Sequence, residues 1–345
     1  MDIKKLIESL KKWILTTENL VAVIALSLIV ILPSIEIITR LLPISGVKGS
    51  SLYIQNLVLW VTFAGALITT REKRHLSLAV GYDLLPEKTQ SIISLTTNFI
   101  FVAVTTTLAY SSFQFVSVAF EAGAKIGVIP TRLILSIIPI SFAGFALHTI
   151  FQKDYNLKKI AIVSLGILLP YLLKLSISPD AFDSYMGFLF WPAIVILLFS
   201  MSVGTPIFVV LGGVAAVLFF NSTGETTVIA NEAYSMLSGP VIPTIPLFTL
   251  AGFILSESKA GERLVNFFQA LFGWMPGGLA IMATIVCAFF TTFTGASGVT
   301  ILALGGLLSF VLVESRYPKK FTTGLLTSAG SIGLLFPPSL PIILY

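Results

Sequence analysis

Two short stretches near the C-terminal end of the chain place small residues, prolines and hydroxyls inside otherwise apolar segments. The first runs from Thr291 to Thr300 and the second from Gly333 to Ser339. Non-helical backbone at membrane depth is tolerated only where protein or a water-filled cavity satisfies its polar groups. Secondary transporters use broken helices of this kind to bind ions and substrates near the middle of the bilayer. We therefore predict that residues 277–345 contain the working site.

The residue types in this region favour sodium over protons as the bound cation. Within residues 277–345 the only carboxylate is that of Glu314, and there is no histidine, whereas proton relays through membranes use Asp, Glu or His. Sodium can be held by backbone carbonyls of unwound segments and by helix C-terminal ends, assisted by hydroxyls. The hydroxyls of Ser297, Thr300 and Ser339 are placed to assist. The sequence thus predicts a sodium site.

The same interruptions leave helix N-termini whose unpaired N–H groups favour an anion, so we also predict an anionic substrate. A structural alternative is that the glycines, prolines and serines serve only as packing and kink residues, as in many membrane helices. Two interruptions follow one another here, and each joins small or hinge residues to hydroxyls. That pairing favours a functional site.

Composition indicates a polytopic membrane protein. Hydrophobic residues make up 56% of the 345 residues and charged residues only 11%, with a mean hydropathy of +0.97. A soluble domain could reach such values only by exposing large apolar patches. The net charge of +5 comes from basic residues between the apolar runs, where they set membrane orientation, so we expect the lipid bilayer and no nucleic acid as partner. One cysteine, Cys287, and two histidines exclude a disulfide framework and a Cys/His metal site.

Apolar runs of about 20 residues predict the membrane-spanning helices. The run 187–220 is too long for one span, so we expect a break at Gly204-Thr205-Pro206. Residues 261–272 predict an amphipathic helix that lies along the membrane and suits a scaffold that braces moving parts, with an ordinary connecting helix as the alternative. Residues 178–183 are expected to be an acidic link, and residues 221–239 a polar connection at the membrane interface. The other predicted spans are 19–42, which we take as a retained first helix rather than a signal peptide, and 53–70, 90–120, 130–151, 160–177 and one beginning with 243–255.

Basic residues fix the orientation of these spans. With the N-terminus in the cytoplasm, most Lys and Arg residues fall on the cytoplasmic side, as the positive-inside rule requires. Residues 277–313 must then leave that side and return to it, either as two full spans or as one re-entrant hairpin. The second arm, 299–313, would be about 22 Å long at the helical rise, and its turn, 294–298, carries no charge. We prefer the hairpin.

The second half of the chain carries motifs in a fixed order: Gly204-Thr205-Pro206-Ile207, Ile245-Pro246-Leu247-Phe248, Gly273-Trp274-Met275-Pro276-Gly277-Gly278, Thr294-Gly295-Ala296-Ser297-Gly298-Val299-Thr300 and Gly330-Ser331-Ile332-Gly333-Leu334-Leu335-Phe336-Pro337-Pro338-Ser339. From about residue 186 onward, their order and spacing resemble the large membrane subunit of tripartite ATP-independent periplasmic (TRAP) transporters. Residues 15–155, with Trp60, Phe63, Arg71 and His75 in the expected places, resemble the small four-helix subunit of that family.

The resemblance implies an all-α, multi-pass fold. Residues 1–155 would form the four-helix small-subunit region, residues 156–185 a linking transmembrane helix, and residues 186–345 the N-terminal half of the large subunit. That half would be the first inverted repeat of an elevator-type transporter, with a re-entrant hairpin and a broken helix. The chain lacks the second repeat and stops inside an apolar run, so we expect a truncation within the large subunit and no transport by this fragment alone.

The resemblance also implies a function, which is not that of an enzyme. The protein would import an organic acid into a bacterium or archaeon, across the cytoplasmic (inner) membrane, driven by sodium and by an elevator mechanism. A soluble periplasmic substrate-binding protein would deliver the substrate. The residues carried over are Gly295, Ala296, Ser297, Thr300, Gly333 and Ser339 for Na⁺, and Thr294, Ser297, Pro337, Pro338 and Ser339 for the substrate.

A different class of function fits the same serine. Gly295-Ala296-Ser297-Gly298 also matches the nucleophile motif of rhomboid-like intramembrane proteases, in which a histidine from a neighbouring helix activates the serine. The only histidines are His75, in a charged run at a helix end, and His148, near the cytoplasmic end of the fourth predicted span. Neither is expected at the depth of Ser297, so the protease is retained only as the alternative function.

Overall fold

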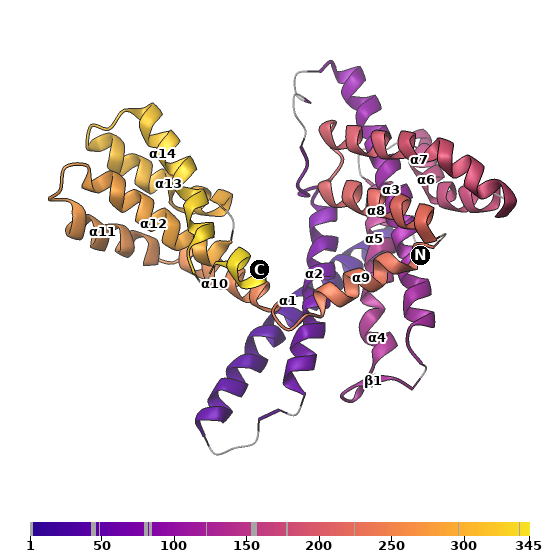
Figure 1. Cartoon of the computed structure of the whole chain (residues 1–345), viewed down its shortest axis with the longest axis horizontal. Coiled ribbons are helices and arrows are strands. Elements are labelled where there is room, and N and C mark those ends of the chain that lie inside the picture. The colour runs from indigo at the N-terminus through magenta and orange to yellow at the C-terminus, as the bar shows by residue number, and fades with distance from the viewer. Residues whose placement is uncertain are drawn as a thin grey trace. The chain divides into compact units, whose positions relative to one another are not determined.

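The chain is almost entirely helical (Figure 1). The computed structural model describes residues 3–42, 46–47, 49–78, 82, 85–121, 123–152, 157–176, 179–223, 225–295, 297–337 and 339–345. It divides into two compact units, 1–238 and 239–345, each with its own apolar core. The predicted all-α fold class is confirmed.

The first unit is a bundle of long helices with one short β-ribbon. The ribbon pairs β1 (Lys125–Ile126) antiparallel with β2 (Ile129–Pro130). The helices are α1 (Ile3–Leu41), α2 (Ser50–Arg71), α3 (Glu87–Val118), α4 (Thr131–Leu135), α5 (Ile137–Ile150), α6 (Leu157–Ser176), α7 (Pro179–Ser202), α8 (Ile207–Thr223) and α9 (Thr227–Leu237).

Four helical stretches in the described residues are long and apolar enough to cross a bilayer: 13–41, 50–71, 87–118 and 131–150. They coincide with the first four predicted spans. Much of their apolar surface is exposed; only 11% of the most apolar window of α1 is buried inside the protein. In a membrane protein that surface faces lipid, because lipid tails are as apolar as the side chains.

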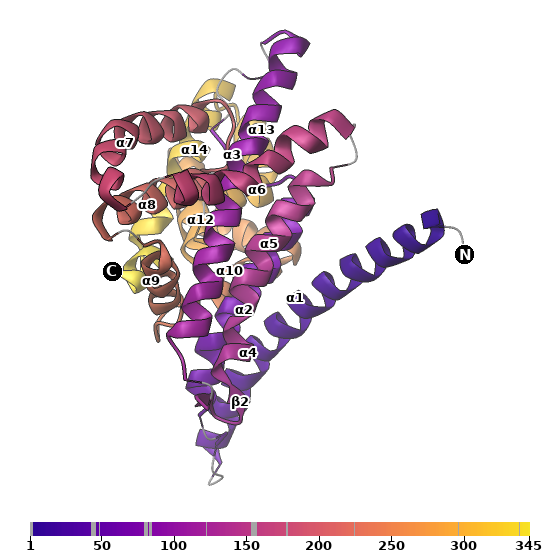
Figure 2. The ribbon, with the colours of Figure 1, turned by 90° about the vertical axis from the view of Figure 1, so that its right-hand side faces the viewer.

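Helix α3 is the centre of this unit and packs against α5, α6, α8 and α9 (Figure 2). Residues 221–239, predicted as a polar connection, contain α9, which lies on α3; Ser111 of α3 donates to the carbonyl of Thr226 at 2.5 Å. The predicted connection 178–183 is wrong, because α7 begins at Pro179. Proline is favoured in the first turn of a helix, where its missing N–H has no partner to lose.

The predicted break between residues 204 and 206 is confirmed, since α7 ends at Ser202 and α8 begins at Ile207. The segment after α2 is joined to this break: the N–H of Ile207 donates to the carbonyl of Leu76 at 3.0 Å. The His75 ring lies 4.7 Å from the Phe208 ring, and its Nε2 is 2.7 Å from the Thr70 hydroxyl. His75 is therefore a structural residue that joins α2 to α8.

Burial of His75 predicts a dependence of stability on pH. Because burial disfavours the charged ring, the pKa of His75 is lowered from its ordinary value. The unfolded chain then binds this proton at a higher pH than the folded chain does. As the pH falls through about 6.5, the free energy of unfolding decreases.

We expect the melting temperature to drop between about pH 7.5 and about pH 5.5, and the drop to be smaller in a His75→Phe variant. Phenylalanine suits the aromatic surroundings and does not titrate. Thermal unfolding in detergent at both pH values measures the effect. An equal drop in the two proteins would show that His75 does not carry this dependence.

Two further polar groups hold α1 in place. Glu18 of α1 accepts from Arg71 of α2 at 3.1 Å and lies 2.7 Å from Nε2 of His148 on α5. Near the other end of α1, Glu36 pairs with Arg40, four residues further along the helix, at 2.7 Å, and also accepts a hydrogen bond from Ser50 of α2. These contacts connect helices that apolar packing alone would allow to slide.

The second unit consists of α10 (Thr244–Glu257), α11 (Ala260–Phe272), α12 (Gly278–Thr294), α13 (Ser297–Glu314), α14 (Lys319–Ile332), a single 3₁₀ turn at Gly333–Leu335 and α15 (Leu340–Leu344). Its core is formed mainly by α12, α13 and α14, with fully buried Met282, Leu308 and Leu312.

The amphipathic helix predicted at 261–272 is present as α11. Its Val265 is buried in the core of this unit, and Leu264 and Phe268 pack against that core. Phe267 and Leu271 are 61% and 49% exposed. The apolar face of α11 is thus shared between the protein and the surroundings, as expected of a helix at a membrane surface.

Candidate functional site

The turn predicted at residues 294–298 joins α12 and α13, which pack against each other as a helical hairpin. The re-entrant placement of this hairpin in the membrane stays a prediction. Helix α12 ends at Thr294, and Gly295 follows in the left-handed region with φ 67°, its N–H bonded to the carbonyl of Thr291 at 2.8 Å. Glycine is the usual residue at this position because it has no Cβ to clash. Helix α13 then starts at Ser297. The glycine therefore ends one helix and lets the chain reverse within two residues.

Three buried threonines close the tip of this hairpin, and we call them the threonine triad: Thr291, Thr294 and Thr300. Thr291 donates its hydroxyl hydrogen to Oγ1 of Thr300 at 2.8 Å, and the hydroxyls of Thr294 and Thr300 are 3.1 Å apart. The three residues are 0%, 5% and 0% exposed. Two arms of the hairpin are thus joined by hydroxyls that are shielded from water.

A second contact joins the hairpin to the helix break. The hydroxyl of Thr292 lies 2.9 Å from the carbonyl of Ala288 and 3.1 Å from the carbonyl of Gly333, and can donate to either. Gly333 is pressed against α12: a Cβ on it would lie 2.3 Å from the Ala288 carbonyl oxygen and 2.6 Å from Cβ of Thr291. Only glycine fits here, and its small size brings two carbonyl oxygens and a hydroxyl together.

The predicted break after Gly333 is confirmed. Helix α14 ends at Ile332, one 3₁₀ turn follows, and α15 begins at Leu340. Ser339 is fully buried and donates its hydroxyl to the carbonyl of Leu334 at 2.7 Å, while Pro337 is exposed. The 3₁₀ turn packs against α12, and α15 packs against α10. The broken segment therefore lies beside the hairpin.

Small residues let other helices approach the tip. A Cβ on Gly330 of α14 would lie 3.3 Å from Cβ of the half-buried Ser297. A Cβ on Gly252 of α10 would lie 2.8 to 3.0 Å from the side chain and backbone of Thr294. The hairpin tip is consequently enclosed by α10 and α14 as well as by its own arms.

The structure thus brings several predicted site residues together and adds others. Thr294 and Thr300 bond directly, Gly333 meets the hairpin through Thr292, and Ser297 faces Gly330. Ala296 and Pro338 lie outside the described residues. The sequence interpretation did not name Thr291, Thr292 or Gly252 as site residues. The two threonines open the first interrupted stretch, residues 291–300, so position alone could have indicated them.

Chemically, the site offers oxygen atoms and little else. Hydroxyls and backbone carbonyls are hard, neutral ligands of the kind that suit small hard cations. The described residues contain no group of three or more His, Cys, Asp or Glu side chains that could hold a metal ion. Both histidines lie in the first unit, where Nε2 of His75 is 2.7 Å from the Thr70 hydroxyl and Nε2 of His148 is 2.7 Å from Glu18. The arrangement gives the protease alternative no support.

Comparison with known families divides the chain in two. Residues 29–153 match the model described as "Tripartite ATP-independent periplasmic transporters, DctQ component", and residues 193–345 match "Tripartite ATP-independent periplasmic transporter, DctM component". The two matches together cover most of the chain, in the order that the sequence motifs predict. The exact boundaries predicted at 155 and 185 stay predictions.

Similar proteins carry the names of permeases. The C4-dicarboxylate TRAP transporter large permease protein DctM of Vibrio cholerae is 31% identical over 154 residues, 44% of this chain and 34% of that protein. The isethionate TRAP transporter permease protein DctMQ of Oleidesulfovibrio alaskensis is 23% identical over 293 residues, 83% of this chain and 45% of that protein. The ectoine TRAP transporter large permease protein TeaC of Halomonas elongata is 26% identical over 128 residues, 37% of this chain and 30% of that protein.

The chain therefore spans about a third to under half of the length of these relatives. The relatives are transport permeases, not enzymes. Two family regions in one chain, an all-helical fold and several membrane-length apolar helices lead to one conclusion. The chain belongs to the tripartite ATP-independent periplasmic transporters, as a multi-pass inner-membrane protein in which a DctQ region and a DctM region are fused.

Proposed function

We propose that the chain takes part in sodium-coupled import of an organic acid, which a periplasmic substrate-binding protein delivers. The observation that carries the proposal is the buried cluster of hydroxyls and carbonyls where the hairpin tip meets the helix break. A continuous membrane helix would satisfy its own backbone groups, so packing alone does not require a break at this cluster. The free-energy cost of the break is offset if the cluster binds a cation during the transport cycle.

Sodium is the cation that the ligand set favours. The carbonyls of Ala288 and Gly333 and the hydroxyl of Thr292 meet at one place, and neutral oxygens replace the hydration shell of an alkali ion. The only carboxylate of residues 277–345 is Glu314, at the last residue of α13, so a proton-binding side chain is lacking at the tip. We propose Gly295, Ser297, Thr300, Gly333 and Ser339, with the threonines named above, as the surroundings of the ion.

An elevator mechanism fits the division of the chain. The DctM match begins at residue 193, but residues 193–238 pack with the DctQ region, while residues 239–345 form a compact unit of their own. The hairpin and the helix break are both in that second unit. We propose that this unit moves as one body and carries the site, while the first unit acts as the scaffold.

The substrate is proposed to be an anion. Two of the relatives are named for C4-dicarboxylates and isethionate, which are anions, and α13 starts at the hairpin tip, where free N–H groups favour negative charge. Thr294, Ser297, Pro337 and Ser339 remain the proposed contacts. The uptake experiment described next first identifies which organic acid is transported.

The uptake experiment uses the complete gene product, reconstituted in liposomes with its periplasmic binding protein, because the fragment alone is not expected to transport. We expect uptake of an organic acid from a panel only when a sodium gradient and the binding protein are both present. A Ser297→Ala variant should reduce uptake by about five- to tenfold, the effect of one lost hydrogen bond of about 1 kcal/mol. Ser328→Ala is the matched control, because Ser328 is exposed and bonds only within α14.

Uptake driven equally well by a proton gradient in sodium-free buffer would contradict sodium coupling. Equal loss in the Ser297 and Ser328 variants would show that the tip serine has no special role. Uptake that ignores the binding protein would contradict the tripartite part of the proposal.

A further inference from the structure

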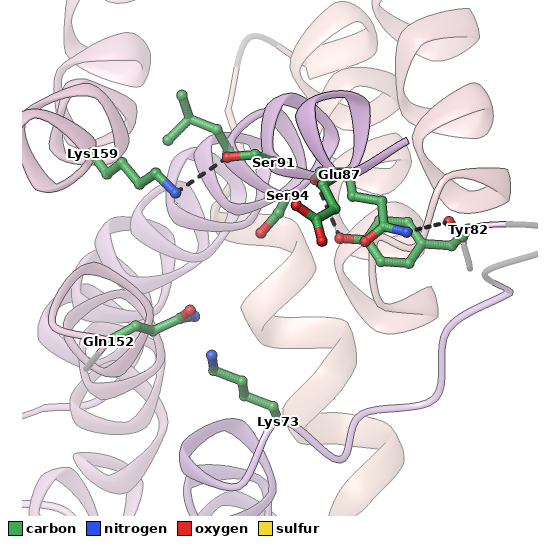
Figure 3. A pocket seen from close by; sticks show the side chains of 9 residues that line it. Lys73, Tyr82, Glu87, Ser91, Ser94, Gln152 and Lys159 are labelled. Carbon is green, nitrogen blue, oxygen red and sulfur yellow. Dashed lines mark hydrogen bonds between the residues drawn. The ribbon is translucent and has the colours of Figure 1, made fainter. Parts of the chain in front are cut away.

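A polar cavity lies at one end of the first unit, away from the hairpin unit in sequence. It consists of two adjoining hollows of about 260 and about 370 Å³ that share Lys73, Tyr82, Ser94 and Gln152 in their lining. Figure 3 shows the outer hollow, with Lys73 and Lys159 approaching it from different elements. A polar hollow of this size among membrane-spanning helices calls for a polar occupant.

Two lysines give the outer hollow its charge. Lys159, in the first turn of α6, places Nζ 3.2 Å from the hydroxyl of Ser91 on α3. Lys73 follows the end of α2, and its side chain points toward Gln152 (Figure 3). Among the described lining residues the carboxylate is that of Glu87, at the start of α3. The described lining of the outer hollow thus places two lysines beside one carboxylate.

The backbone of Lys73 is unusual for a lysine. Its φ is 55°, in the left-handed region that favours glycine, and it occupies the position after a helix end where glycine is the common choice. Glycine at position 73 would adopt this left-handed backbone conformation at a lower conformational free energy than lysine does. This conformation turns the lysine back over the end of α2, beside the cavity.

The inner hollow is lined by hydrogen-bonding groups together with apolar side chains such as Phe101 and Val203. Hydroxyls and amides come from Thr97 and Asn98 of α3, Thr149 of α5 and Ser77 of the segment after α2. Both hollows lie where the basic residues around 71–74 and 158–159 gather. The positive-inside rule predicts the cytoplasmic side of the membrane for these basic residues. Basic pockets between membrane helices on the cytoplasmic side recognise the anionic headgroups of lipids.

We propose that this cavity binds an anionic phosphate group, held by Lys73 and Lys159 and by the neighbouring hydroxyls and amides. The phosphate belongs either to the headgroup of an anionic phospholipid that enters from the membrane or to free phosphate. Most of the lining belongs to the DctQ match, while Lys159 lies on α6 just beyond it, and the site is independent of the transport site proposed above. Its occupant would connect the segment after α2 with α3 and α6, which contribute Lys73, Ser91 and Lys159 to the lining.

The test uses the full 345-residue chain in a neutral detergent, titrated with phosphatidylglycerol, with phosphatidylcholine and with inorganic phosphate, and followed by native mass spectrometry and calorimetry. We expect one phosphatidylglycerol or one phosphate to bind, and phosphatidylcholine to bind far less. The double variant Lys73→Ala, Lys159→Ala should bind the anion about 30-fold more weakly, because each lysine near an anionic lipid usually strengthens binding by about fivefold. Lys125→Ala is the matched control, since Lys125 is exposed and follows the far end of α3.

A Glu87→Gln variant keeps the proposal testable if the double variant fails to fold. Removing the one carboxylate should tighten anion binding severalfold, a gain that misfolding cannot produce. Binding of phosphatidylglycerol that inorganic phosphate does not displace identifies a lipid headgroup, and binding of phosphate alone identifies the free anion. The proposal would be overturned if neither phosphatidylglycerol nor inorganic phosphate bound. It would also be overturned if binding were unchanged both in the double variant and in Glu87→Gln.

Discussion

A Gly333→Ala substitution is expected to lower the melting temperature of the chain by on the order of 5 °C and to abolish sodium-dependent uptake. The new Cβ would lie 2.3 Å from the carbonyl oxygen of Ala288 and 2.6 Å from Cβ of Thr291. Neither neighbour is the far end of a flexible side chain, so α12 and the helix break must separate. Separation also breaks the contact between Thr292 and the Gly333 carbonyl.

The backbone of Gly333 makes this a clean steric test. Its φ of −61° is helical, so alanine would adopt the same conformation without strain, and only space is lacking. Gly324→Ala, on the α14 helix that directly precedes Gly333, is the matched control, because a Cβ there meets nothing within 4 Å and alanine is the better helix former by up to about 1 kcal/mol.

Thermal unfolding in detergent and uptake in liposomes should both be measured for the two variants. Gly324→Ala is expected to keep uptake and to melt at the same temperature or higher. If Gly333→Ala melted and transported like the original protein, the close approach of the break to α12 would not be essential.

A Thr300→Val substitution is expected to raise the sodium concentration for half-maximal uptake by about tenfold or more. Valine has nearly the same shape as threonine but cannot accept the hydrogen bond from Thr291 or share one with Thr294. A buried hydroxyl that loses its partner costs about 1–3 kcal/mol. The tip of the hairpin would therefore loosen where we propose that the ion binds.

Sodium titrations of uptake distinguish this effect from a general loss of folded protein. Misfolding lowers the maximal rate, whereas damage to the ion site shifts the sodium dependence. Thr323→Val is the matched control, because its hydroxyl is exposed and bonds to Lys319 within α14. A Thr300 variant with unchanged sodium dependence would place the ion elsewhere.

Local sequence predicted the helices and their interruptions well. The break between α7 and α8 was predicted from run length and Gly204-Thr205-Pro206, and the turn between α12 and α13 from glycines and hydroxyls. These signals act within a few residues, through conformational preference and the apolar length that a bilayer requires. A connection was wrongly predicted at residues 178–183 because the acidic residues suggested a loop, whereas Pro179 starts α7.

The partners within the site could not be predicted in the same way. Thr292 meets Gly333 across 41 residues of sequence, and Gly252 lies against Thr294 from another helix. In a single sequence these residues resemble ordinary threonines and glycines of membrane helices. Only the packing of α10, α12 and α14 makes them neighbours.

The sequence by itself thus determined the membrane class, the order of helices, the hairpin, the break and the resemblance to one transporter family, because each depends on composition or on spacing along the chain. The tertiary structure decided which hydroxyls and carbonyls face one another, and that helices α7 to α9 belong to the same compact unit as the DctQ region. Contacts between helices depend on the shapes of surfaces that are far apart in sequence, and no local pattern records those shapes.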